Sequence, residues 1–282
     1  MKVRNPAYAG TFYEGSAQSL KAQIEDCFKH ELGPKTLPKV ADSKLKSIIG
    51  LVSPHAGYMY SGPVAAHSYY TLAQDGKPDT VVILAPNHTG AGSGIATMRE
   101  GAWRTPLGNV EIDTALADSV VKESNIIDVD EVAHMREHSI EVQLPWLQYL
   151  YGSSFKFVPI CLLMQDFESS REVGTAVAKA LRNKNALVIA STDMTHDEPQ
   201  KVAERKDKTV IDAAVKLDEK ALYSTVEANQ VSMCGFGPVT ATITAVKQLG
   251  AKNGKLLCYK TSGDAVGDYS AVVGYASLVF TR

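Results

Sequence analysis

Short runs of apolar residues recur along the chain, and most of them are rich in Val, Ile and Leu. They span residues 48–52, 81–85, 155–163, 186–191, 256–261 and 271–280. Apolar runs of this length are typical of strands that are buried on both faces. The pattern therefore predicts a central sheet that is covered on both sides.

Between these runs, apolar residues recur every three to four positions, which predicts amphipathic helices. The helices are expected over residues 16–28, 62–73, 114–124, 138–150, 169–182 and 235–249, with further helices between 202 and 222. Residues 95–112 instead predict a hairpin-like excursion. The alternation of strands and helices favours a three-layer α/β/α fold with a mixed, mainly parallel sheet, formed by residues 1–282 as a single domain.

Composition places the chain among ordinary globular proteins, with 45% hydrophobic and 21% charged residues. The formal net charge of -2 argues against a nucleic-acid or anionic-membrane partner, because both usually select a basic surface. The first residues lack the apolar core of a signal peptide, and no run of about 18 apolar residues is present, so we expect a cytoplasmic protein. The four cysteines are widely spaced, which predicts neither a zinc knuckle nor a disulfide framework.

Histidines follow three of the predicted strands. His55 comes after Pro54, His88 follows the next strand, and His196 lies five residues beyond the strand at 186–191. Because the carboxyl ends of parallel strands meet at one edge of a sheet, these imidazoles are expected to converge. Histidine is the commonest metal ligand in proteins, so the arrangement predicts a metal site.

Two other residues could contribute to such a site. Asp193 precedes His196 by three positions and could ligate a metal or orient an imidazole, although it could equally cap a turn. Cys234 lies just before a predicted helix, whose dipole would favour a thiolate. A buried, inert thiol is the alternative interpretation of Cys234.

Two further patterns are weaker. Residues 134–138 read H-x-x-E-H, the pattern of inverted zincin peptidases, but the helical rhythm starts only at about His138. The glycine-rich stretch 89–94 lacks the Gly-Lys of a phosphate-binding loop and predicts a flexible loop instead.

Taken together, several ordered motifs resemble those of the Memo family, the mediator of cell motility proteins and their archaeal and bacterial homologues. These motifs are NPAYAGTFY at 5–13, SPHAGY at 53–58, PNH at 86–88, EHSIE at 137–141, STD at 191–193 and CG at 234–235. The resemblance covers nearly the whole chain. It implies a fold similar to that of the class III extradiol ring-cleavage dioxygenases.

The resemblance also implies a site. By position, His55, His88 and Cys234 match the metal ligands of the family, and iron or copper is the implied metal, with zinc as a third candidate. His138 or His196 would then act as the base toward a metal-bound small molecule, and Asp193 would fix the tautomer of that base. A cysteine replaces the glutamate ligand of the dioxygenases, so their activity cannot simply be transferred to this chain.

Two functions therefore stay open. One is a redox or dioxygenase-like metalloenzyme acting on a small molecule, and the other is a non-catalytic protein that binds metal, a protein or a peptide. An inverted-zincin-like metallopeptidase is a third, minor alternative. An enzyme needs acid or base groups beside the metal, whereas a carrier needs only ligands. The position of His138 and His196 relative to His55 and His88 therefore discriminates between the first two.

Overall fold

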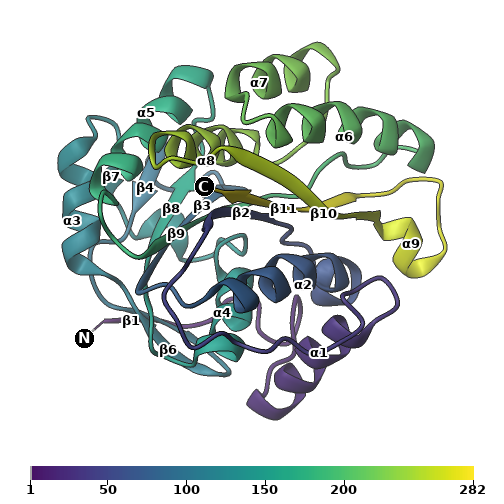
Figure 1. Ribbon diagram of the computed structural model, residues 1–282, viewed down its shortest axis with the longest axis horizontal. Helices are drawn as coiled ribbons and strands as arrows, with labels where there is room; N and C mark the ends of the chain where they lie inside the picture. Colours follow the sequence, from purple (N-terminus) through teal and green to yellow (C-terminus); the bar gives the residue numbers. More distant parts are fainter. Residues whose placement is uncertain (1) are drawn as a thin grey trace.

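The computed structural model describes residues 2–282, and its centre is a sheet of eight strands. In spatial order the strands are β10 (Asn253–Thr261), β11 (Gly274–Thr281), β2 (Ile48–Ser53), β9 (Ala186–Ser191), β3 (Thr80–Pro86), β8 (Lys156–Leu162), β4 (Ile95–Thr97) and β7 (Asp128–Val129). Helices cover both faces of this sheet, so the protein has the three-layer α/β/α architecture that the sequence predicts (Figure 1).

The four middle strands, β2, β9, β3 and β8, run parallel to one another. Strands β11 and β4 flank them in the antiparallel direction, which makes the sheet mixed. Every residue of β2 and β3 is buried, because helices pack on both faces of the sheet. The parallel strands end at the same edge of the sheet, and this edge carries the candidate site.

One face of the sheet is covered by α2 (Tyr58–Asp75), with α1 (Ala17–Lys29) and α4 (Leu144–Tyr151) packed beside it. The other face is covered by α8 (Phe236–Gln248) and α5 (Phe167–Ala180), with α3 (Thr114–Glu123), α6 (Gln200–Val215) and α7 (Glu219–Ala228) around them. Figure 1 shows the two helical layers on opposite sides of the strands. The short helix α9 (Ser262–Val266) lies between β10 and β11 in the chain.

Local sequence signals explain the start of several helices. The side chain of Ser16 accepts a hydrogen bond from the backbone N–H of Ser19 at 3.2 Å and caps α1, as predicted. Leu20 and Ile24 then face the core from this helix. Asp113 caps α3 in the same way. No helix within residues 2–282 is long and apolar enough to cross a membrane.

Residues 95–112 do not form one hairpin, as predicted, but contribute strands to two different sheets. Its first part, β4, joins the central sheet, and only β5 (Ala102–Thr105) and β6 (Gly108–Glu111) form a hairpin. The strand β1 (Val3–Arg4) pairs with β5 to complete a separate three-stranded sheet. This pairing joins residues about a hundred positions apart, so no local pattern could have indicated it.

Two predicted helix boundaries were also wrong. The helix expected from His138 begins at Leu144, after a short 3-10 turn at Glu141–Gln143, and Pro145 occupies its first turn. Helix α2 begins at Tyr58 rather than at residue 62, because the Tyr58 N–H donates to the carbonyl oxygen of Phe12 at 2.7 Å. In both cases the boundary depends on backbone contacts that helical periodicity does not report.

Candidate metal centre

Three adjacent strands bring the candidate residues together. Strand β9 pairs with β2 on one side and with β3 on the other, in parallel register. His55 and His88 leave the carboxyl ends of β2 and β3, and Asp193 leaves the end of β9 between them. Of the three imidazoles expected to meet at this edge of the sheet, those of His55 and His88 lie close together, and His138 takes the place expected for His196.

The closest group, which we call the metal group, consists of His55, His88 and His138. Each of these residues offers a potential ligand atom within 4.8 Å of the others. Their ring centroids lie 4.7 to 5.2 Å apart. His55 is buried at 2% side-chain exposure, His138 is exposed by 15%, and His88 reaches solvent at 34%. Across residues 2–282, no other three potential ligands of this kind approach one another so closely.

The tautomer of His55 follows from its neighbour Ser191. The hydroxyl of Ser191 donates its only proton to the carbonyl oxygen of Ser139 at 2.6 Å, and its Oγ accepts a bond from Gln143 at 2.7 Å. His55 Nδ1 lies 3.0 Å from the same Oγ and must therefore carry the proton. The other ring nitrogen, Nε2, is left with a lone pair that can bind a metal.

His88 is held in the same way by Glu137, which is fully buried. The backbone N–H of His88 donates to Glu137 Oε2 at 2.6 Å, and Nδ1 of His88 lies 2.9 Å from Oε1. The N–H of Ser139 donates to Oε1 as well, at 2.9 Å. A carboxylate on one ring nitrogen is the usual support of a metal-ligating histidine, because it orients the ring and raises its basicity.

The protonation states suit metal binding. Burial would raise the pKa of Glu137, but the hydrogen bond from His88 and the charges of His88 and His138 hold this pKa at about 2. Burial lowers the pKa of His138 to about 4, against the opposing effect of Glu137. Burial also lowers the pKa of His55 well below its ordinary value, with His138 and His88 adding to the effect. His55 and His138 are thus neutral at pH 7, as ligands must be.

The donor set fits a transition metal. His55 and His88 each have Nδ1 engaged by an oxygen, which leaves Nε2 as the ligand atom, and Nε2 of His55 also lies 3.2 Å from Sγ of Cys234. The His138 ring lies stacked near His88. Neutral imidazoles suit zinc, copper, iron and nickel, whereas magnesium and calcium prefer oxygen ligands. The three histidines could therefore hold a metal ion of the first kind.

Cys234 and Asp193 lie on the border of this group. The Sγ atom of Cys234 is 3.2 Å from Nε2 of His55, and it accepts a bond from the backbone N–H of Asp193 at 3.2 Å. The Asp193 carboxylate accepts from the N–H of His55 at 2.8 Å, and its second oxygen is 3.9 Å from Nε2 of the same ring. Both residues thus contact His55, while Cys234 falls outside the group of three mutually close ligands.

The surroundings of Cys234 favour the buried-thiol interpretation over the thiolate that the helix dipole would favour. Its position two residues before α8 would favour a thiolate, but burial, followed by the charge of Asp193, raises the pKa of the thiol. Burial likewise raises the pKa of Asp193 to about 6, in spite of the hydrogen bond from His55. Desolvation therefore outweighs the helix dipole at this position.

His196 lies near the group without joining it. Its Nδ1 is 2.8 Å from the carbonyl oxygen of Met194 and 2.9 Å from that of Ser232. Carbonyl oxygens only accept, so Nδ1 carries the proton and Nε2 is free to accept one. The expectation that Asp193 fixes this tautomer was wrong, because backbone carbonyls do so. His196 is still close enough to contribute to the lowered pKa of His55.

The structure separates the two histidines of the H-x-x-E-H pattern. His138 belongs to the metal group, whereas His134 is fully buried against Trp103, with ring centroids 5.7 Å apart. Glu137 anchors His88 and is not free to activate a water molecule. An inverted zincin needs both histidines on one metal, so the peptidase interpretation does not fit this geometry.

Sequence reasoning missed the roles of Glu137 and Ser191, which orient His88 and His55. Both residues stand in the family motifs EHSIE and STD, but nothing in the sequence indicates which side chain each of them orients. In the glycine-rich loop, the N–H groups of Thr89 and Gly90 donate to Asn87 Oδ1. Because these two N–H groups already donate to Asn87, they are not available to bind a phosphate, and the loop does not form a phosphate-binding site.

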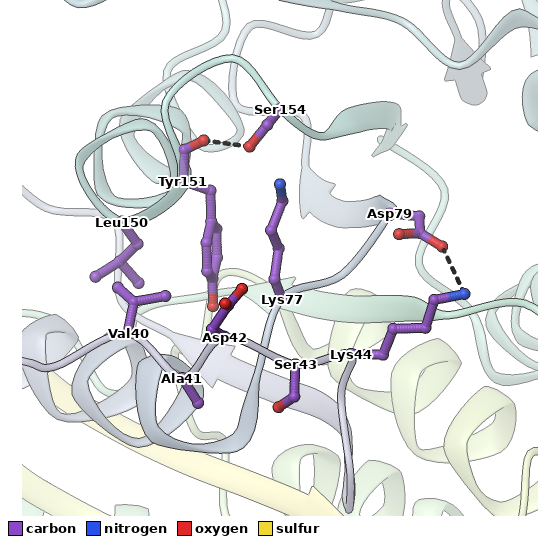
Figure 2. Close-up of a pocket in the computed structure, with 10 residues that line it drawn as sticks. All are labelled: Val40, Ala41, Asp42, Ser43, Lys44, Lys77, Asp79, Leu150, Tyr151 and Ser154. Atoms are coloured by element: carbon purple, nitrogen blue, oxygen red, sulfur yellow. Dashed lines mark hydrogen bonds and ion pairs between the residues drawn. The ribbon is translucent and has the colours of Figure 1, made fainter.

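A pocket of about 500 Å³ opens elsewhere on the surface. Figure 2 shows Lys77 in this pocket, between Tyr151 and the ion pair of Lys44 with Asp79. Its residues precede β2, β3 and β8, whereas the metal group follows the other end of the strands. The pocket therefore lies at the amino ends of these parallel strands, and the metal group lies at their carboxyl ends.

Comparison with known proteins adds the family. A family model described as Memo-like protein matches residues 4–279. The chain belongs to the Memo family. A MEMO1 family protein of Methanopyrus kandleri is 55% identical over 281 residues, covering 99% of both chains. One from Methanothermobacter thermautotrophicus is 52% identical and covers 98% of this chain and 99% of its own length.

A solved structure supports the fold. The crystal structure of an uncharacterized protein from Escherichia coli K12 covers 82% of this chain and 99% of its own, with a TM-score of 0.52. The two sequences are only 14% identical, so this likeness concerns the fold alone. The Memo-family membership rests on the family model and on the close relatives.

Proposed function

We propose that this member of the Memo family binds a metal ion through the ring nitrogens of His55, His88 and His138. The observation that carries the proposal is the convergence of these three histidines, two of which are anchored at Nδ1 by Glu137 and Ser191. We propose iron or copper as the metal, with zinc as a third candidate. The single domain over residues 1–282 and the cytoplasmic location stay predictions.

Cys234 is proposed as a ligand that depends on the ion. Its Sγ atom lies 3.2 Å from Nε2 of His55, and burial raises the pKa of the thiol, so ligation would require loss of the thiol proton. Thiolates favour softer ions such as copper(I) and zinc, whereas iron(II) also binds to sites made of imidazole and carboxylate ligands. The set of His55, His88 and Cys234 suggested by the family resemblance and the group of three histidines can therefore apply to different metals.

We further propose redox chemistry on a small molecule. A bound iron or copper ion would supply electron transfer or dioxygen chemistry. The protein supplies the proton-accepting groups. Nε2 of His196 is the best candidate base, because its Nδ1–H is fixed by two carbonyl oxygens. Asp193 holds the backbone of His55 in place.

Non-catalytic metal binding is the alternative, and the presence of His196 near His55 favours an enzyme over a carrier. The first experiment is elemental mass spectrometry of the purified protein and of four variants, His55→Ala, His88→Ala, His138→Ala and Cys234→Ser. His30→Ala serves as the matched control, since His30 is exposed at the C-cap of α1 and lies outside the group of three histidines. The three histidine variants should lose most of the metal, and equal metal content in all samples would reject the site.

A further inference from the structure

His138 is held differently from the other two histidines. His88 and His55 each have a ring hydrogen bond to an oxygen and a second bond from the backbone N–H. For the His138 ring, the acceptor nearby is Glu137 Oε1, 3.3 Å from Nδ1. That oxygen already accepts from His88 and Ser139, so it fixes the orientation of His138 only weakly.

Aromatic packing surrounds this ring instead. Phe12 lies 4.6 Å from His138 between ring centroids, and Tyr8 lies at 5.3 Å. These two rings also pack edge to face with each other at 4.9 Å. The nearly parallel ring of His88, at 4.7 Å, and the perpendicular ring of His55, at 5.2 Å, are the other two ring neighbours. The direction in which His138 points therefore depends on the N-terminal segment that carries Tyr8 and Phe12.

A buried carboxylate holds this segment against the site. Glu141 accepts hydrogen bonds from the backbone N–H groups of Ala7 and Tyr8, both at 2.9 Å. It also accepts from the hydroxyl of Tyr13 at 2.6 Å and pairs with Arg4 at 2.7 Å. Glu141 follows His138 by three residues in the chain. The same short stretch thus bears a ligand candidate and the anchor of the segment that packs on it.

The segment is also tied to the other side of the site. The carbonyl oxygen of Phe12 accepts from the N–H of Tyr58, three residues after His55. Phe12 is therefore clamped between the loop after β2 and the His138 ring. Any displacement of residues 4–13 would move the ring that packs on His138.

We infer that Phe12 is a positioning residue of the metal centre and that docking of residues 4–13 is coupled to metal binding. This inference rests on the proposed metal function. Because coupling is reciprocal, a segment that strengthens metal binding must itself be held more firmly when the metal is bound. A purely structural role of Phe12 would instead alter stability without changing metal affinity.

The first test measures the affinity for Zn²⁺ by competition with a chromophoric chelator. Phe12→Ala should weaken binding about tenfold or more, as is typical when a group that orients a ligand is lost. Phe12→Tyr, which keeps a ring at this position, should stay close to the wild type. Phe167→Ala is the matched control, because Phe167 is also half-buried but packs against Tyr223 on α7. Equal affinity of all four proteins would overturn the inference.

The second test uses the wild-type chain and so does not depend on a variant that folds. Hydrogen exchange of the amides of Ala7 and Tyr8 should slow when Zn²⁺ is added, and His88→Ala should abolish this slowing. Unchanged exchange in a wild type that binds zinc would overturn the coupling alone. The exchange measurement is repeated with iron(II) and copper, and a wild type that binds none of the three ions would overturn both the coupling and the proposed metal site.

Discussion

Replacing Glu137 with glutamine is the most informative single change in this structure. The carboxylate is fully buried and faces three N–H donors, the backbone and ring of His88 and the backbone of Ser139. Glutamine has nearly the same shape but only one oxygen, so its NH₂ group must face at least one of these donors. The change therefore leaves the shape of the site intact and removes its charge and one acceptor.

The pKa of Glu137 gives the scale of the effect. A shift from the ordinary value of 4.5 to about 2 corresponds to about 3 kcal/mol in favour of the ionised form. For an acid whose pKa is lower in the folded protein, this stabilisation is complete above pH 4.5 and is lost as the pH falls toward 2. At pH 7 we therefore expect Glu137→Gln to lower the free energy of unfolding by about 3 kcal/mol, and metal affinity by about 10- to 100-fold.

Chemical denaturation and zinc competition titrations would measure the two effects separately. Asp75→Asn is the matched control, because the Asp75 carboxylate also accepts several bonds, from the backbone of Lys46, Ser47 and Ile48, at the opposite edge of the sheet. This control should lower stability but leave zinc affinity unchanged. If Glu137→Gln behaved like Asp75→Asn, Glu137 would be a structural residue only, and our account of the support of His88 would be wrong.

Two further predictions concern stability. Burial lowers the pKa of His134 to about 3, and because this base is neutral in the folded state, its protonation favours unfolding as the pH falls below 6.5. Between pH 7.5 and 5 the wild type should lose about 2 kcal/mol through this residue, a loss that His134→Phe should lack in urea titrations at both pH values. Arg4→Met should cost about 3–5 kcal/mol by leaving Glu141 charged and unpaired, whereas adding Glu141→Leu should recover part of the loss in a double-mutant cycle. Additive costs for these two changes would contradict this interpretation of the ion pair.

Periodicity predicted the fold well where elements are long. The strands β2, β3, β8 and β9 are apolar apart from one polar residue at an end of each, because helices cover both faces of the sheet. Short strands were not predicted, since β4 has only three residues and β7 only two. Two or three residues carry too little pattern to separate a strand from a loop.

The site was predictable to the extent that it lies at strand ends. His55 and His88 were found because each directly follows a buried strand, and adjacent parallel strands end together. His138 was expected beside the metal as a base, and its ring lies among the three mutually close groups that could hold a metal. Its distance to the other two depends on a loop of irregular backbone, which no repeat in the sequence describes.

That loop, residues 137–141, explains why the site cannot be read from the strands alone. Glu137 anchors His88, the Ser139 hydroxyl donates to the carbonyl of Pro86 at the end of β3, and the Ser139 carbonyl accepts from Ser191 at the end of β9. Glu141 then fixes the N-terminal segment. The loop thus joins two strand ends and residues 4–13 through buried hydrogen bonds, each of which would be costly to leave unsatisfied. These hydrogen-bond partners come from distant parts of the chain, so the sequence shows the need for them only as the family motif at 137–141. The physical reason for this motif is visible only in the folded structure.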